Sequence, residues 1–180
     1  MKRQLKKIVC LALITSMILG QKTLNTTKNV TAKEKKDIKI AIYAGHQARG
    51  NFATEPVGPG SSTRKAKVAG GATGVASHVP EYKLTLAVSK KLQKELKARG
   101  YKVYMIRTKN NVNISNKKRA QLANKSGADI YIRIHADSSN SRAVTGASGL
   151  YPSKANRYVS KLSAKSKKLS SCLLKSYCKK

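Results

Sequence analysis

Acidic residues are scarce in this sequence of 180 residues. Seven Asp and Glu stand against 38 Lys and Arg, which gives a formal net charge of +31. A field of that strength attracts polyanions, and salt screens the attraction because the Debye length is only about 8 Å at physiological ionic strength. Hydrophobic residues still make up 40% of the chain, which excludes disorder throughout and allows one compact domain. Composition alone leaves nucleic acid, anionic lipid and anionic wall polymers open as partners.

Cysteine is also scarce, with three residues in the whole chain. Cys10 lies in an apolar stretch near the N-terminus, whereas Cys172 and Cys178 lie six residues apart in a segment with helical periodicity. Six residues rotate a helix by about 240° and advance it by about 9 Å. The two thiols would therefore face apart and could not pair. This excludes a disulfide framework, and we expect both cysteines to act as small apolar residues.

Only one long hydrophobic run occurs, from Ile8 to Leu19, and basic residues precede it at positions 2, 3, 6 and 7. The run is too short for a transmembrane helix of about 20 residues, but it is typical of a signal peptide. We therefore predict a signal peptide or N-terminal anchor over 1–20 and a polar linker over 21–36. Export argues against nucleic acid as the partner and limits membrane contact to the N-terminal segment.

The remaining chain, 37–180, alternates strand and helix patterns. β-branched runs predict strands over 39–43, 101–107 and 129–134, and the Gly-rich segment 145–151 is a candidate fourth strand. Helical periodicity follows at 81–99, at 113–125 with Asn113 or Ser115 as the N-cap, and from about residue 154 onward. Segment 47–80 has no sustained period and is predicted to be a long loop. The pattern indicates a single α/β domain, with a twisted and mostly parallel sheet flanked by helices.

The first predicted helix carries an apolar stripe at four-residue spacing, opposite a Lys-rich polar face. Its members are Leu84, Val88, Leu92 and Leu96.

Three scarce residues fall where a ligand would bind such a sheet. His46 and His135 directly follow predicted strands, at the carboxyl ends where α/β sheets bind ligands. Glu81 opens the first long helix, where the helix dipole favours a carboxylate. Singly, each is ordinary: a histidine in a loop, or a carboxylate at a helix start. Two histidines and one carboxylate with a fourth position open are nevertheless the ligand set of a catalytic zinc site.

Four motifs carry a family resemblance: "YAGH" (43–46), "PEYKLTLAVSKKLQKELKARGYKVYMIRT" (80–108), "ISNKKRAQLANKSGADIYIRIHAD" (114–137) and "TGASGLY" (145–151). Together they resemble the zinc-dependent N-acetylmuramoyl-L-alanine amidases of bacterial autolysins and sporulation hydrolases. The resemblance implies Zn²⁺ bound by His46, Glu81 and His135. It also implies cleavage of the amide between muramic acid and L-alanine in peptidoglycan, by a secreted or cell-wall protein that anionic wall polymers attract.

The sequence departs from that family in two places. Tyr43-Ala44 stands where the family usually has Asp-Pro or a similar pair before Gly-His. The family's general-base Glu follows on a later strand, whereas no acidic residue follows Asp137 here, so we expect an amidase domain that is incomplete at its C-terminus. Asp137 and Glu55 are the candidates to replace that base, although both also fit solvated loop positions.

The departures leave two alternatives to an active amidase. One is a zinc-binding and wall-binding homologue that lacks the general base, and the other is a basic polyanion-binding protein without a metal.

Three further residues have weaker patterns. His78 is expected to be structural or solvated, and Arg107 and Arg119 are expected on the surface or in ion pairs, with contact to stem-peptide carboxylates as the alternative for both arginines.

Overall fold

The structure is a computed structural model that describes residues 34–141 and 143–179. The predicted signal peptide or anchor and most of the predicted linker lie outside this range. Along the described chain the elements are η1 (Lys35–Asp37), β1 (Lys39–Ala44), β2 (Asn51–Pro56), β3 (Arg64–Val68), α2 (Glu81–Ala98), β4 (Lys102–Met105), α3 (Asn116–Lys125), β5 (Ile130–Ile134), η2 (Ser160–Leu162) and α4 (Ser163–Tyr177). None of the described helices is long and apolar enough to cross a membrane.

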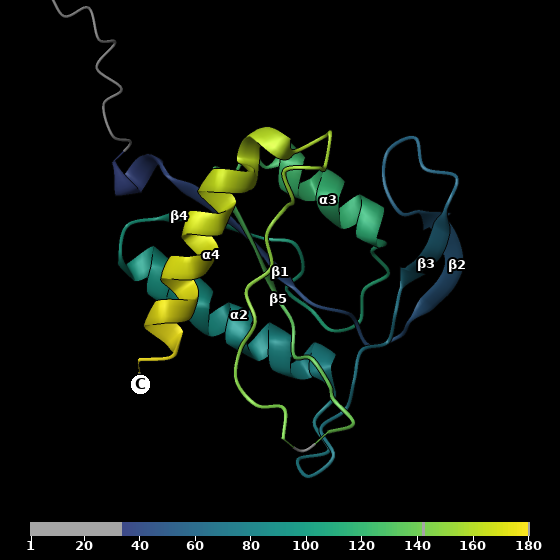
Figure 1. Cartoon of the computed structure of the whole chain (residues 1–180). Helices are drawn as coiled ribbons and strands as arrows, with labels where there is room; N and C mark the ends of the chain where they lie inside the picture. The colour runs from purple at the N-terminus through teal and green to yellow at the C-terminus, as the bar shows by residue number, and fades with distance from the viewer. Residues whose placement is uncertain (1–33, 142, 180) are drawn as a thin grey trace, which may run out of the picture.

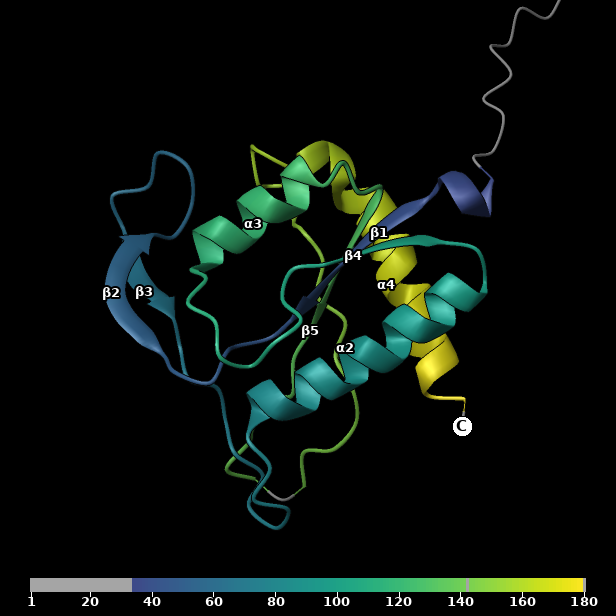
Figure 2. The same ribbon diagram turned by 180° about the vertical axis from the view of Figure 1, so that it is seen from behind.

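A three-stranded parallel sheet with strand order β4-β1-β5 forms the centre of the fold. The strand in the middle, β1, is buried along almost its whole length. Because successive side chains of a strand point to opposite faces, its residues alternate between two cores. Figures 1 and 2 show α2 along one side of this sheet and α3 along the other. The predicted α/β class, with a mostly parallel sheet flanked by helices, is confirmed.

Each helix closes one of the two cores. On one face Ile40, Ile42 and Ala44 pack with Leu86 of α2 and Met105 of β4. The other core joins Ala41, Tyr43, Ile106 and Ala123, the last of these from α3. Fixed registers of β1 with β4 and β5 keep the two sets on their own faces, since a slip by one residue would exchange them.

Helix α2 packs on the sheet with only part of its apolar stripe, since Leu92 and Leu96 lie against the core. Its buried residues are Glu81, Thr85, Leu86 and Ser89, whereas Leu84 and Val88 stay 45% and 42% exposed. The first half of the stripe therefore remains exposed. The helix is held by its polar edge, because the Thr85 hydroxyl donates a hydrogen bond of 2.8 Å to the carbonyl of Gly45.

Segment 47–80 is not a continuous loop. Strands β2 and β3 form an antiparallel hairpin within it, with an irregular register between Asn51 and Thr54. The irregularity breaks the period-2 pattern, so the sequence shows no strand signal there. The candidate strand over 145–151 is also wrong, because none of those residues lies in a strand. Helix α3 begins after Ser115, whose side chain accepts from the Lys118 backbone N–H as an N-cap.

The C-terminal helix α4 is mostly exposed. Only Ser163 is buried in it, and Leu173 and Tyr177 remain 47% and 73% exposed. Figure 1 shows α4 crossing in front of the sheet, and Figure 2 shows it behind. Within the described part of the chain Cys172 and Cys178 are both free, and they do not pair with each other, as predicted. Both are exposed, however, and do not act as packed apolar residues.

The core on the α2 face should dominate stability. Ile42 is 0% exposed, and truncation to alanine at such a site leaves a cavity. We expect Ile42→Ala to lower the free energy of unfolding by about 2–5 kcal/mol, measured by urea denaturation with an unchanged m-value. Leu173→Ala on α4 is the control and should change it by less than about 0.5 kcal/mol. Equal effects of the two changes would contradict this assignment of the core.

Candidate metal centre

Three side chains meet at the carboxyl edge of the sheet. His46 follows β1, His135 follows β5, and Glu81 is the first residue of α2. One ligand atom from each lies within 4.8 Å of the other two. The Glu81 carboxylate stands between the imidazoles, with Oε2 at 3.1 Å from His46 Nε2 and Oε1 at 3.0 Å from His135 Nδ1. The three residues that the sequence singled out are thus brought together.

The donor types in this group suit a zinc ion. In a tetrahedral site with ligand bonds of about 2.0–2.1 Å, neighbouring ligand atoms are about 3.3 Å apart. The two imidazole-to-carboxylate distances, 3.1 and 3.0 Å, go to the two different oxygens of Glu81, and one ligand atom from each residue lies within 4.8 Å of the others. Side-chain rotation would therefore have to bring the three atoms to the spacing of a bound ion. Nitrogen from two histidines and oxygen from one carboxylate are also the donor types that zinc prefers. This donor set fits Zn²⁺ with one position open.

Backbone groups hold two of the three side chains, His46 and Glu81, from behind. His46 Nδ1 lies 2.8 Å from the carbonyl of Ala69, which places the ring proton on Nδ1 and leaves Nε2 free to bind a metal. The Glu81 carboxylate accepts from the backbone N–H groups of Ala72 and Ala136, at 3.1 and 2.9 Å. These contacts orient the ligands without requiring the metal to do so.

The same contacts set the charge of the ligands. Burial acts to raise the pKa of Glu81, but the N–H groups of Ala136 and Ala72 and the neighbouring His46 and His135 outweigh it, and the pKa lies below its ordinary value. Burial lowers the pKa of His135 despite its hydrogen bond to Glu81. An ionised carboxylate and a neutral imidazole are the protonation states that bind a divalent cation.

Two glycines make room for this arrangement. A Cβ at Gly45 would lie 2.7 Å from the His135 ring, and one at Gly71 would lie 2.8 Å from the His46 ring. His46 itself has a φ of 57°, which is uncommon for a residue other than glycine. Strain of this kind persists only where the surroundings enforce it. The loop after β1 is therefore held in one conformation by its neighbours.

Arg107 is the first of two arginines that hold the loop after β1 in this conformation. The side chain is 2% exposed and follows β4. Its Nη2 donates to the carbonyls of Gly45 and Tyr82 at 2.8 and 2.7 Å, and its Nε donates to Ala44 at 3.1 Å. Gly45 precedes His46, and Tyr82 follows Glu81. One guanidinium thus ties together the backbones that carry two of the three ligands.

Arg119 of α3 supports the same loop from the opposite face of the sheet. It is 0% exposed. Its Nη1 donates to the carbonyl of Ala44 at 3.2 Å, and its Nη2 donates to the carbonyl of His46 at 3.0 Å and to Gln47 Oε1 at 2.9 Å. Its guanidinium also lies over the Tyr43 ring, 4.8 Å from the centroid. Both arginines converge on the single carbonyl of Ala44.

Neither arginine forms an ion pair with a carboxylate in the part of the chain that the structure describes. The expectation that Arg107 and Arg119 occupy surface or ion-pair positions is therefore wrong, because each is buried and bonded mainly to carbonyl oxygens. Burial and the nearby charge of Arg119 lower the pKa of Arg107 to about 10, and burial also lowers the pKa of Arg119. Holding two unpaired charges inside the protein costs free energy. This cost indicates that the conformation of the loop carrying His46, which both arginines support, matters to the protein.

The two candidate replacement bases lie in different environments. Glu55 belongs to β2, is 5% exposed and accepts from the backbone N–H of Lys117 at 2.8 Å, so it holds the start of α3. The prediction that Glu55 lies in a solvated loop is therefore wrong. Asp137 is exposed in the segment after β5, two residues beyond His135. His78 is exposed as expected and does not join the three-residue group.

Sequence reasoning missed Thr85 and Gln47 as supporting residues. Thr85 donates to the carbonyl of Gly45, and Gln47 accepts from Arg119 and from the Ile114 backbone N–H at 3.0 Å. A signal for the first was present, because Glu81, Thr85 and Ser89 recur at four-residue spacing and mark one polar edge of the helix. For Gln47 the only signal in the sequence was its position beside His46.

With this geometry in view, comparison with known proteins assigns the family. Residues 40–179 match the family described as N-acetylmuramoyl-L-alanine amidase. Because the match spans most of the chain, the protein belongs to the N-acetylmuramoyl-L-alanine amidase family. No curated protein matches the sequence.

Two solved structures share the fold. The N-acetylmuramyl-L-alanine amidase Ami1 of Mycobacterium abscessus is 23% identical with a TM-score of 0.53, covering 57% of this chain and 49% of its own. Ami1 of Mycobacterium smegmatis is 22% identical with a TM-score of 0.54, covering 59% of this chain and 50% of its own. The chain thus matches about half the length of these structures.

The buried arginines generate a prediction about metal affinity. Arg107→Lys keeps the charge but loses the fork that reaches Gly45 and Tyr82 together. We expect zinc affinity to fall by about 10–100-fold, measured by chelator competition. Unpaired carbonyls should also lower the free energy of unfolding by about 1–3 kcal/mol. Arg99→Lys, with a side chain 69% exposed, should change neither. A less stable Arg107→Lys protein with unchanged zinc affinity would show that this arginine supports only the fold.

Proposed function

We propose that this protein is a zinc-dependent N-acetylmuramoyl-L-alanine amidase that hydrolyses the amide between muramic acid and L-alanine of peptidoglycan. The observation that carries the proposal is the meeting of His46, Glu81 and His135 within 4.8 Å, in a chain of this amidase family. His46, Glu81 and His135 would hold the zinc ion, which would supply a bound water with a pKa near 7 and a Lewis acid for the scissile carbonyl.

The residues of the chain then have separate tasks. His46 and His135 offer neutral imidazoles and Glu81 offers an anionic oxygen, while backbone N–H groups hold the carboxylate in place. The arginines fix the loop that presents His46. Amide hydrolysis also needs a group that takes a proton and returns it to the leaving nitrogen. Among the described carboxylates, Glu55 already accepts a hydrogen bond from the backbone N–H of Lys117. Asp137 is exposed and lies two residues after His135 in the sequence.

The placement of these carboxylates supports a second candidate function. A homologue that binds zinc and the wall but hydrolyses weakly would have the same three ligands and the same basic surface. Removal of a general base costs about 10²–10⁴-fold in rate. The two candidates therefore differ in hydrolysis and agree in zinc binding.

A charge of +31 and a peptidoglycan substrate favour anionic wall polymers as the main charged partners. We infer a secreted or cell-wall location, with the segment 1–20 directing export. Basic residues are abundant on α4, whose exposed face carries Lys165, Lys168 and Lys175. Such a surface would hold the protein at the wall while the metal centre acts on the peptide link.

Metal content tests the site directly. We expect purified protein to hold about one zinc per chain, measured by inductively coupled plasma mass spectrometry, because three protein ligands and one open position form a catalytic zinc site. A double variant, His46→Ala with His135→Ala, should hold none at the same protein concentration. The variant His78→Ala is the matched control and should keep its zinc. Full zinc in the double variant would refute the ligand assignment.

Hydrolysis separates the two candidate functions. Purified walls are incubated with the zinc-loaded protein, and new L-alanine amino termini are counted. An active amidase should release them, and Asp137→Asn should reduce the rate about 10²-fold or more if this acid carries the proton. Release that is no greater than with the His46→Ala, His135→Ala protein would reject the amidase and leave the wall-binding homologue. Equal rates for Asp137→Asn and the unaltered protein would exclude Asp137 as the base.

Salt tests the charged partner. Binding to intact walls should fall steeply as salt rises from low to physiological strength, because screening weakens contacts between exposed charges. Walls stripped of anionic polymer should bind much less in a sedimentation assay. Replacing Lys165, Lys168 and Lys175 with Gln should weaken binding at low salt without changing zinc content. Binding that ignores salt and stripping would mean that charge has no part in targeting.

A further inference from the structure

His135 has the fewest hydrogen bonds to the backbone of the three candidate metal ligands. The His46 ring contacts the carbonyl of Ala69, and two backbone N–H groups hold the Glu81 carboxylate. His135 has neither kind of support, because its Nδ1 faces Glu81 and its Nε2 has no hydrogen-bond partner in the described part of the chain. Its side chain is also 30% exposed, against 17% for His46 and 6% for Glu81. Another contact has to set the plane of this imidazole.

A neighbouring aromatic ring supplies that contact. Strands β1 and β5 lie side by side (Figure 1), and their register pairs Tyr43 with Arg133. Because side chains two residues apart in a strand point to the same face, His135 follows Arg133 on the face that Tyr43 occupies. The rings of Tyr43 and His135 are stacked, with their centroids 5.5 Å apart and their planes at 28°. This separation lies within the range of about 4.5–7 Å that attractive aromatic pairs prefer.

The backbone leaves room for the His135 ring beside Tyr43. Gly45 lies at this place, and a Cβ there would come within 2.7 Å of the ring. The Gly45 N–H donates to the carbonyl of Ile134 at 2.9 Å, so the two chains stay in register as far as His135. The edge of the His46 ring borders the other side, at 4.9 Å between centroids and 85° between planes. The imidazole of His135 is thus confined by two rings and a glycine.

Tyr43 is itself held in place on several sides. Its side chain is 3% exposed, and its hydroxyl donates to Asn116 Oδ1 at 3.0 Å. The guanidinium carbons of Arg119 and Arg133 lie 4.8 and 4.7 Å from the centroid of its ring, where a cation is attracted to an aromatic face. A buried ring with these contacts has little freedom to turn. It therefore presents a fixed face to His135.

From these contacts we propose that Tyr43 is a positioning residue of the metal centre. Its ring fixes the plane of the His135 imidazole and keeps Nδ1 directed toward Glu81. The inference rests on the proposed zinc function for the identity of the metal. It also gives a role to one departure from the family pattern, because an aspartate at position 43 could not stack on an imidazole. Through Asn116, the first residue of α3, the same ring links that helix to a ligand on β5's carboxyl end.

The first test observes the imidazole without a metal. Proton–carbon NMR spectra of the metal-free full chain are recorded at about pH 8, above the ordinary pKa of histidine, and the His135 signals are identified by their loss in His135→Gln. A stacked imidazole lies in the ring current of Tyr43. Tyr43→Leu should therefore shift the His135 signals, whereas Tyr43→Phe should leave them close to their original place. Unmoved His135 signals in Tyr43→Leu would overturn the proposal.

The second test measures zinc affinity by chelator competition. Tyr43→Leu should weaken zinc binding about 10-fold or more, because loss of a group that orients a ligand typically has an effect of this size. Tyr43→Phe keeps the ring and loses only the bond to Asn116, so it should bind zinc like the unaltered protein.

Tyr104→Leu is the matched control for both tests. It makes the same change in the same core, at a tyrosine of β4 that forms no hydrogen bond or ring contact with the three described ligands. It should leave the His135 signals and the zinc affinity unchanged. Cobalt(II) bound in place of zinc reports the ligand geometry through its visible absorption, which should change in Tyr43→Leu and stay the same in Tyr104→Leu.

The remaining outcomes separate the positioning role from its alternatives. Equal losses of zinc affinity in Tyr43→Leu and Tyr104→Leu would indicate a general effect of the core and overturn the positioning role. An equal loss in Tyr43→Phe would assign the effect to the hydroxyl and overturn stacking as its cause. If the unaltered protein bound no zinc while its His135 signals moved in Tyr43→Leu, the proposed zinc function alone would fail. Zinc binding with unmoved His135 signals would refute the role of Tyr43 alone.

Discussion

Two buried guanidinium groups, which have no carboxylate partner among the described residues, are the constraint on which the site depends. Arg107 and Arg119 approach the loop after β1 from opposite faces of the sheet, and both donate to the carbonyl of Ala44. Their remaining bonds reach the backbone on either side of His46 and just after Glu81. Without these donors, the buried carbonyls would be unpaired, and a non-glycine residue at a φ of 57° would have little to hold it.

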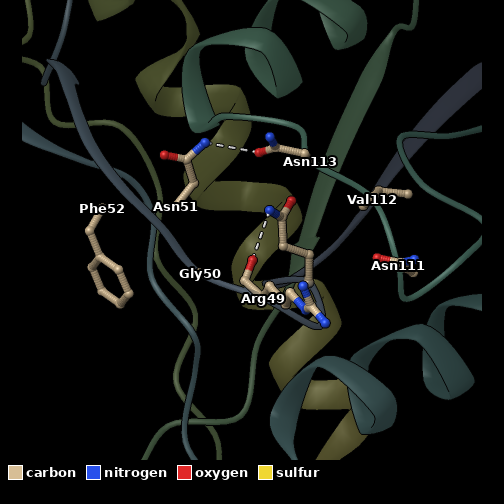
Figure 3. A pocket seen from close by; sticks show the side chains of 8 residues that line it. Arg49, Gly50, Asn51, Phe52, Asn111, Val112 and Asn113 are labelled. Carbon is tan, nitrogen blue, oxygen red and sulfur yellow. Dashed lines mark hydrogen bonds between the residues drawn. The ribbon is translucent and has the colours of Figure 1, made fainter.

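The same network joins the metal centre to the surfaces around it. Gln47 accepts from Arg119 and, with residues 49–52 and 111–113, lines the pocket shown in Figure 3. Glu55 of the β2–β3 hairpin accepts from Lys117 at the start of α3, the helix that carries Arg119. The hairpin, α3 and the loop after β1 are thus connected by hydrogen bonds of buried side chains. A substitution in any of them can alter the geometry at the metal.

The fold class and the meeting of His46, Glu81 and His135 were predictable from sequence, whereas the residues that support them were not. Strand and helix periods place His46, Glu81 and His135 at element ends, and parallel strands end at one edge of the sheet. Burial of Arg107 has no such local sign, because its acceptors at 44, 45 and 82 come together only in the folded chain. Likewise, Leu84 and Val88 are exposed because the polar edge of α2 meets the loop after β1. The helical period alone cannot determine which edge of the helix does so.

The bonds to Glu81 have a consequence for the order of assembly. Its carboxylate joins the loop at Ala72, the start of α2 and the segment after β5 through backbone N–H groups. Small zinc-binding domains that fold only around their metal lack such metal-independent bonds between segments. In this protein the bonds to Glu81 join the three segments without a metal, so folding can precede metal loading. A metal ion would then bind side chains that the folded chain already holds in place, so its binding would complete the site without being needed to form the fold.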